Sequence, residues 1–137
     1  MRWFVLLILL TSFKAYGQLA VTKISDLDFG VVPQDGPAKT VPPNGFETAE
    51  NASFLVTGPA NTAYSIILPR RFTMDHSSGT GKSIKVDNII SFPAEGNNGF
   101  LNPSGEQYLY VGATREAIQK NLTTGFYSAT FTVEVVF

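Results

Sequence analysis

The stretch from Gly125 to Phe137 alternates apolar and polar side chains more regularly than any other, and it constrains the fold most strongly. Its apolar positions are Tyr127, Ala129, Phe131, Val133, Val135 and Phe137. Strand side chains point to opposite faces in turn, so the pattern predicts one long strand with a packed face and a solvated face. It begins at Gly125 and ends on an inward-facing Phe137. Such a strand needs a facing sheet to bury its apolar side.

The first residues carry the features of a secretory signal peptide. Arg2 is followed by an apolar run from Phe4 to Leu10, and small residues stand at Ala15 and Gly17. The run is too short to span a membrane, and this order is typical of a cleaved leader. We therefore expect residues 1–17 to be removed and residues 18–137 to form a single exported domain without a transmembrane segment. Its expected location is the periplasm, the cell surface or the extracellular space.

Composition limits what the mature chain can do. It has no cysteine, so disulfides cannot stabilise it and an apolar core must. Without Arg2 and Lys14, the ten basic residues fall to eight against eleven acidic ones, a net charge near −3. That balance argues against binding to nucleic acid.

The rest of the mature chain reads as short strands separated by turns rich in Gly, Pro and Asn. The expected strands are 19–24, 27–31, 52–57, 62–68, 72–75, 83–92 and 107–113, with 52–57 and 62–68 paired as a hairpin. A change of parity at Asp87-Asn88 predicts a β-bulge. The loop from Pro93 to Gly105 is expected to be irregular. Together these predict an all-β protein: an antiparallel two-sheet sandwich, immunoglobulin-like, with about seven or eight strands and a core that includes Phe54, Tyr64, Ile66, Leu68, Phe131 and Val133.

Residues 114–121 are ambiguous. They suit a single helical turn with Thr114 as its N-cap, or a poor edge strand, and we favour the short helix.

Five short motifs, in order along the chain, resemble the secreted bacterial family called domain of unknown function 4402. They are Leu27-Asp-Phe29-Gly30, Phe54-x-Val56-Thr57-Gly58, Tyr64-x-Ile66-x-Leu68-Pro69, Val111-Gly112 and Gly125-x-Tyr127-Ser128. The resemblance implies export, a bacterial source and an all-β fold, and it implies no activity.

The C-terminal strand is also similar to that of pilin subunits assembled by a chaperone and an usher, which place a Gly twelve positions before a terminal aromatic. Gly125 and Phe137 have this spacing. In such subunits the strand is an exposed edge that a neighbour's strand completes. The candidate assembly residues are Gly125, Tyr127, Phe131, Val133, Val135 and Phe137. The alternative is an ordinary core strand that ends in Phe, which we favour.

Catalytic and metal-binding patterns are weak. His76 is the single histidine, and its neighbours Asp75 and Ser77 would point to the opposite face of an extended segment. One histidine without cysteine cannot build a zinc site, and Asp26-x-Asp28 is a poor calcium pattern. We therefore expect no enzyme activity, no metal and no cofactor.

Three classes of function remain. We favour a structural or adhesive, fimbria-like surface subunit whose partners are copies of itself or other subunits, joined through edge strands, with a periplasmic chaperone. The alternative is a secreted binding module for glycan or protein, with Tyr108, Tyr110 or Phe100 as stacking platforms, although we expect these aromatics to pack in the core. An enzyme is the least favoured class.

Overall fold

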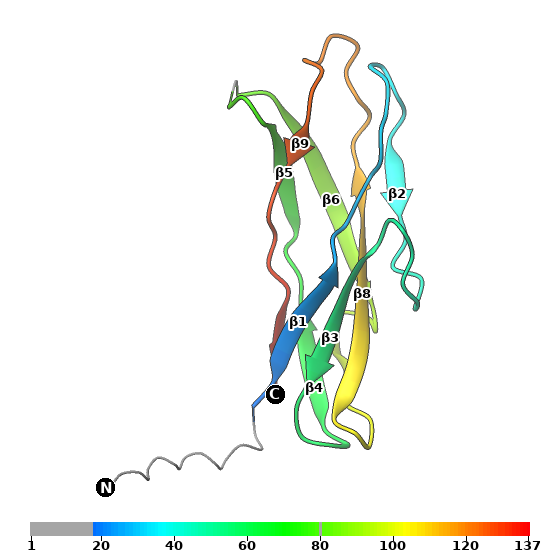
Figure 1. Cartoon of the computed structure of the whole chain (residues 1–137), viewed down its shortest axis with the longest axis vertical. Helices are drawn as coiled ribbons and strands as arrows, with labels where there is room; N and C mark the ends of the chain where they lie inside the picture. The colour runs from blue at the N-terminus through cyan, green and yellow to red at the C-terminus, as the bar shows by residue number, and fades with distance from the viewer. Residues whose placement is uncertain (1–17, 80) are drawn as a thin grey trace, which may run out of the picture.

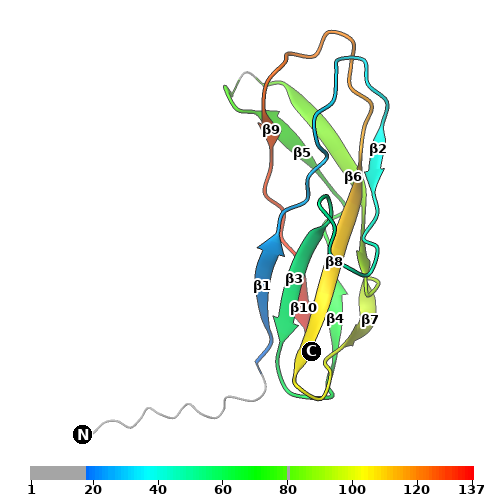
Figure 2. The same ribbon diagram turned by 45° about the vertical axis from the view of Figure 1, so that its right-hand side comes forward.

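A computed structural model describes residues 18–79 and 81–137. The predicted signal peptide lies outside this part of the chain. The described chain is all-β and forms two antiparallel sheets that enclose one apolar core (Figures 1 and 2), which confirms the predicted β-sandwich. No helix occurs within these residues, so none could span a membrane.

The larger sheet contains seven strands in the order β1-β3-β8-β6-β5-β9, with β2 also paired to β8. Their bounds are β1 Ala20–Ser25, β2 Lys39–Val41, β3 Ala52–Thr57, β5 Arg71–His76, β6 Ser83–Phe92, β8 Glu106–Arg115 and β9 Tyr127–Ser128. The smaller sheet has the order β10-β4-β7, from β4 Ala63–Ile67, β7 Gly96–Phe100 and β10 Glu134–Val136. The bounds predicted for β3 and β6 are confirmed, and Asn88 has a positive φ of 50° where the register of β6 against β8 shifts, as the parity change predicted.

The central strands of the two sheets supply the most deeply buried side chains of the core. Val56, Ile66, Val86, Leu109 and Val111 are fully buried. Of the predicted core residues, Tyr64, Ile66 and Leu68 are buried, whereas Phe54, Phe131 and Val133 are partly buried and pack against the cluster. All six predicted core positions therefore face one core.

The expected hairpin of β3 and β4 is wrong. β3 pairs with β1 and β8, whereas β4 pairs with β7 and β10 in the other sheet. Residues 58–62, which connect β3 to β4, cross from one sheet to the other because they are hydrogen-bonded to the turn before β8. Gly58 N–H donates to Gly105 O at 2.9 Å, and Asn61 N–H donates to Asn102 O at 3.2 Å.

The strand expected at 27–31 is also wrong, although Phe29 is buried in the core. The Asp28 carboxylate accepts the Gly30 N–H at 2.8 Å, and Gly30 has a φ of +77°. This local bond replaces a strand ladder, which is the usual effect of Asp two residues before such a Gly.

Residues 114–121 form no helix. Thr114 and Arg115 extend β8: the Thr114 and Thr40 hydroxyls are 2.9 Å apart across the β2–β8 pair, and the Arg115 side chain is buried. Ile118 is then held by a bond from its N–H to Gly36 O at 2.8 Å. Tertiary pairing therefore overrides the helix signal at Thr114.

The Gly- and Asn-rich loop contains β7, which pairs with β4. The ring of Tyr64 lies directly on Gly99, where an added Cβ would come within 2.3 Å of the ring. Glycine is therefore required at this strand position, because the neighbouring ring occupies the place of a side chain.

Candidate assembly site

The C-terminal segment runs along a neighbouring strand that is itself divided between the sheets. β9 pairs with β5 in the larger sheet, and β10 pairs with β4 in the smaller one. Since β4 and β5 are separated only by residues 68–70, both pairs belong to two long strands that cross from one sheet to the other. The single strand predicted for 125–137 is thus observed as two short strands, and the residues between them belong to neither sheet.

A kink at Pro69 opens this pairing in the middle. Eight residue steps separate Ile67 from Asp75, whereas six separate their partners Glu134 and Ser128. The two extra residues surround Pro69, which has no N–H to donate to a ladder. Residues 129–133 therefore lie outside the ladder, with no backbone hydrogen bond to another described residue.

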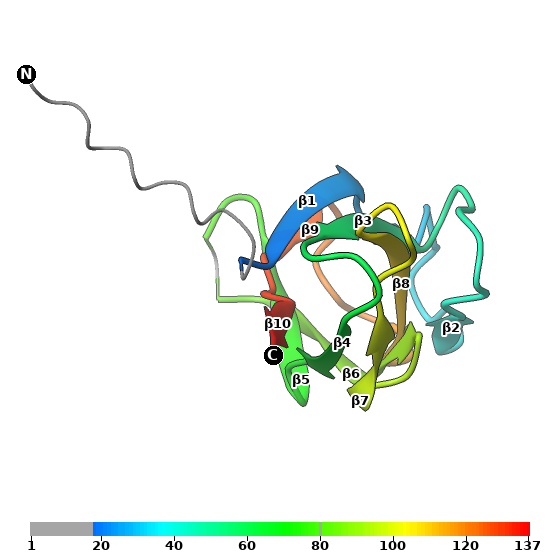
Figure 3. The same cartoon turned by 90° about the horizontal axis from the view of Figure 1, so that it is seen from below.

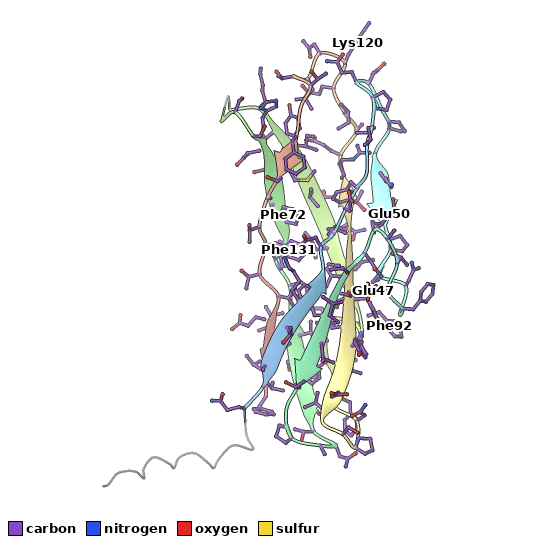
Figure 4. The ribbon with its side chains drawn as sticks, viewed as in Figure 1. Glu47, Glu50, Phe72, Phe92, Lys120 and Phe131 are labelled. Atoms are coloured by element: carbon purple, nitrogen blue, oxygen red, sulfur yellow. The ribbon has the colours of Figure 1, made fainter. Side chains whose placement is uncertain are left out.

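An aromatic pair fills part of the opening. The rings of Phe72 and Phe131 stack with centroids 5.2 Å apart and planes at 10° (Figure 4). Beside them is a cavity of about 410 Å³, lined by Ile67, Leu68, Pro69, Phe72, Thr130, Phe131, Thr132 and Glu134. Of these lining residues, Leu68 belongs to the core and Phe131 packs against it.

The opposite edge of this segment faces β1. β1 pairs only with β3 and β10 only with β4, so each leaves one edge without a partner in the described chain. Figures 1 and 3 place the start of β1 next to β10. The inward apolar residues on both sides of this junction are partly buried: Leu19, Val21, Phe131, Val133 and Val135. The core is thus only partly covered between the first and last strands. We call the backbone of residues 129–136, with its unpaired edge, the C-terminal edge.

The predicted assembly residues are only partly brought together. Phe131, Val133 and Val135 line the junction, and Tyr127 lies further along in β9. Phe137 does not line the junction, because its side chain is 59% exposed. The expectation that the strand ends on an inward-facing aromatic is therefore wrong. The reason is that β10 ends at Val136 and no strand continues the pairing that would hold Phe137 inward.

Gly125 has a local role. Its φ is +142°, and an added Cβ would lie 2.3 Å from His76 Nε2. His76 Nε2 donates to Thr124 O at 2.8 Å, which leaves Nδ1 to accept the Ser78 N–H at 3.0 Å. The ring also meets Tyr127 edge-on, with centroids 5.0 Å apart. His76 therefore ties two loops together.

The aromatics expected in the core lie partly outside it. Tyr108 and Phe100 are both 52% exposed, and Tyr110 is partly exposed. The expectation of core packing is wrong for the two tyrosines because Leu109 and Val111 take the inward positions of β8, and for Phe100 because its neighbours Gly99 and Leu101 are the buried residues there.

No group of three or more His, Asp or Glu side chains suited to a metal occurs in the described ranges. Lys23 pairs with the Asp26 carboxylate at 2.7 Å, and Asp28 accepts its bond from Gly30.

These features define an antiparallel β-sandwich whose first and last strands each have an unpaired edge in the described chain. The chain belongs to the family described as Domain of unknown function (DUF4402), whose profile matches residues 19–137. No curated protein and no solved structure shows significant similarity to it.

Proposed function

We propose that this protein is an exported, non-catalytic bacterial surface subunit of structural or adhesive, fimbria-like type, whose C-terminal edge accepts a strand from a neighbouring subunit. The observation that carries the proposal is the junction between β1 and the C-terminal edge, where apolar side chains are half-buried and backbone groups have no partner among the described residues. Such edges are templates for strand addition.

Two features support the match between this edge and an extended peptide. Main-chain groups of residues 129–133 are available for pairing, and alternate side chains on an added strand could enter the core between Val21 and Val133. Backbone pairing would provide affinity, and these side chains would provide specificity. The edge is similar in this respect to that of chaperone-assembled pilins, although Phe137 does not take part.

Export is part of the proposal. It is supported by the apolar run from Phe4 to Leu10 and by the small residues before Gln18. N-terminal sequencing of the protein from the periplasmic or secreted fraction should begin at Gln18. Retention of Met1 on protein in the membrane fraction would contradict cleavage.

Strand uptake is tested with purified residues 18–137 and with a chain lacking residues 18–24, compared by sedimentation velocity. We expect the longer chain to associate as its concentration rises. The shorter chain should bind a synthetic peptide of sequence Gln18 to Ile24, which refills the place of β1 beside β3, and only slower exchange of the amides of residues 129–133 on binding would show that the C-terminal edge also pairs with a strand. The control is the same peptide with proline in place of Val21, which cannot complete a ladder. Monomers in both cases, with no peptide uptake, would refute the assembly proposal.

A second candidate, a secreted module that binds glycan or protein, is favoured by the exposed aromatics on β8.

A further inference from the structure

The outer face of the larger sheet carries a group of aromatic side chains that point away from the core. Tyr108 and Tyr110 occupy alternate positions of β8, and Phe92 on β6 lies directly opposite Tyr110. Two positions along a strand span about 7 Å, so the two tyrosines are close neighbours on one face. Phe92 is 55% exposed and Tyr108 is 52% exposed. Exposed apolar groups that cluster on a sheet face mark interaction surfaces more often than single ones do.

A loop adds to this group from the side. β2 and β3 pair with the same edge of β8, with Val41 opposite Ala113 and Ala52 opposite Val111. Residues 42–51 are therefore an excursion from one interrupted strand, and they leave the sheet at Gly112. An added Cβ on Gly112 would lie 2.0 Å from the Val41 carbonyl oxygen, so only glycine allows the loop to pass there.

The loop is held rigidly by Asn51, which is fully buried. Its amide nitrogen donates to Pro43 O at 2.7 Å and to Phe46 O at 2.9 Å, and its side-chain oxygen accepts the Thr48 N–H at 2.9 Å. A loop fixed in this way loses little conformational entropy when a ligand binds.

The fixed loop brings Phe46 and Glu47 to the aromatic group. An added Cβ on Gly45 would lie 3.3 Å from the Phe92 ring, so the ring rests on the loop. Glu47, labelled in Figure 4, is near enough to Tyr110 for its charge to act on that hydroxyl, and Phe46 is 63% exposed. Burial and, after it, the negative charge of Glu47 and that of ionised Tyr108 raise the pKa of Tyr110. We call Phe46, Glu47, Phe92, Tyr108 and Tyr110 the aromatic face.

Its tyrosine hydroxyls are free to bind a ligand. Tyr64 and Tyr127 donate their hydroxyls to Gln107 Oε1 and to Thr123 O. In contrast, those of Tyr108 and Tyr110 make no hydrogen bond to any residue in the ranges 18–79 and 81–137. Cross-strand packing would explain Phe92 beside Tyr110. It would not explain a pinned loop that adds a further exposed phenylalanine and a carboxylate to them.

We propose that the aromatic face is a binding site for a neutral carbohydrate chain. A sugar ring presents C–H groups on its faces and hydroxyls around its rim. The C–H groups can pack on the electron-rich faces of Tyr108, Phe92 and Phe46, and the hydroxyls can bond to Glu47 and to the tyrosine hydroxyls. Glu106 lies two residues before Tyr108 on the same face of β8. Together with Glu47, it gives the border of the aromatic face a negative charge, which disfavours anionic ligands such as nucleic acid. The inference rests on the binding-module candidate and is independent of the C-terminal edge.

The test uses residues 18–137 and an array of neutral and acidic oligosaccharides, followed by calorimetry with the best neutral ligand. We expect binding to neutral sugars, with Tyr108→Ala weakening the affinity at least tenfold. Tyr108→Phe should retain most of the affinity if the ring face dominates. The matched control is Phe100→Ala, which removes an equally exposed aromatic from β7 in the other sheet and should change the affinity less than twofold.

Three results would overturn the inference. One is that no neutral oligosaccharide on the array binds. Another is that Tyr108→Ala and Phe100→Ala weaken binding equally. The third is that Tyr108→Ala abolishes a concentration-dependent dimer or the binding of a cationic peptide, which would assign the face to a protein partner. Because β3 lies between β8 and β1 and Tyr108 is on the outer face of the sheet, loss of sugar binding with unchanged uptake of the Gln18 to Ile24 peptide would separate this site from the assembly edge.

Discussion

Truncation of Phe131 tests whether the C-terminal segment is part of the core. Phe131 stacks on Phe72 and packs against the buried cluster, although it is only partly buried and borders the 410 Å³ cavity. Loss of a fully buried Phe costs about 3–5 kcal/mol. Since solvent already reaches one side, we expect Phe131→Ala to cost about 2–4 kcal/mol, of which the aromatic pair accounts for about 0.5–1.5 kcal/mol.

Phe137→Ala is the matched control, because it removes the same side chain from the same segment at a 59% exposed position. It should change the stability by less than about 0.5 kcal/mol. Urea denaturation of residues 18–137 measures both values through the midpoint at constant slope. A cost below about 1 kcal/mol for Phe131→Ala, or equal costs for the two variants, would refute the assignment of Phe131 to the core and of Phe137 to the surface.

Three further predictions concern single side chains. Burial raises the pKa of Tyr64 from 10.0 to about 12. The contribution of the neutral Tyr64 side chain to folding stability should therefore be complete below pH 10 and lost as the pH rises towards 12. In denaturant titrations at alkaline pH, Tyr64→Phe should reduce this loss of stability. Arg115 is buried, its Nε is unbonded to any described residue, and desolvation lowers its pKa. The Arg115→Met protein should therefore be at least as stable as the parent. A decrease in the free energy of unfolding above about 2 kcal/mol would contradict this. Gly125→Ala should lower the stability by about 1–3 kcal/mol, because the added Cβ would strain the backbone and collide with His76. The control is Gly79→Ala, which should cost less because Gly79 also has a positive φ but has open space around it. Equal melting temperatures of the two variants would disprove the collision.

The elements predicted best were those in which local pattern and tertiary pairing agree. In β3 and β6 the apolar positions match the inward face, and the Asp87-Asn88 bulge followed from the parity change alone. The alternation of the C-terminal segment also predicted that Phe131, Val133 and Val135 turn inward, whereas Ala129, which has the same parity, is exposed. Its division between two sheets could not be predicted, because it depends on the kink at Pro69 in a partner strand.

Other features depend on contacts between distant residues. The Gly-rich strand β7 exists because the Tyr64 ring covers Gly99, and such a segment has low intrinsic strand preference. Likewise, Tyr108 and Tyr110 follow the same alternation as Leu109 and Val111, so sequence alone could not show which set faces the core. The loop that completes the aromatic face could be predicted only as one of the turns rich in Gly, Pro and Asn.

The most direct test of the assembly proposal is amide hydrogen exchange of residues 129–133. It is measured on purified residues 18–137 and on the protein recovered from the bacterial surface. In the isolated chain these amides should exchange rapidly, because they have no backbone partner among the described residues, whereas those of the central strand β8 should be protected. In the surface form, pairing with a neighbour's strand should slow the exchange of residues 129–133 and leave β8 unchanged. Equal, rapid exchange of residues 129–133 in both forms would contradict the claim that this edge joins one subunit to the next.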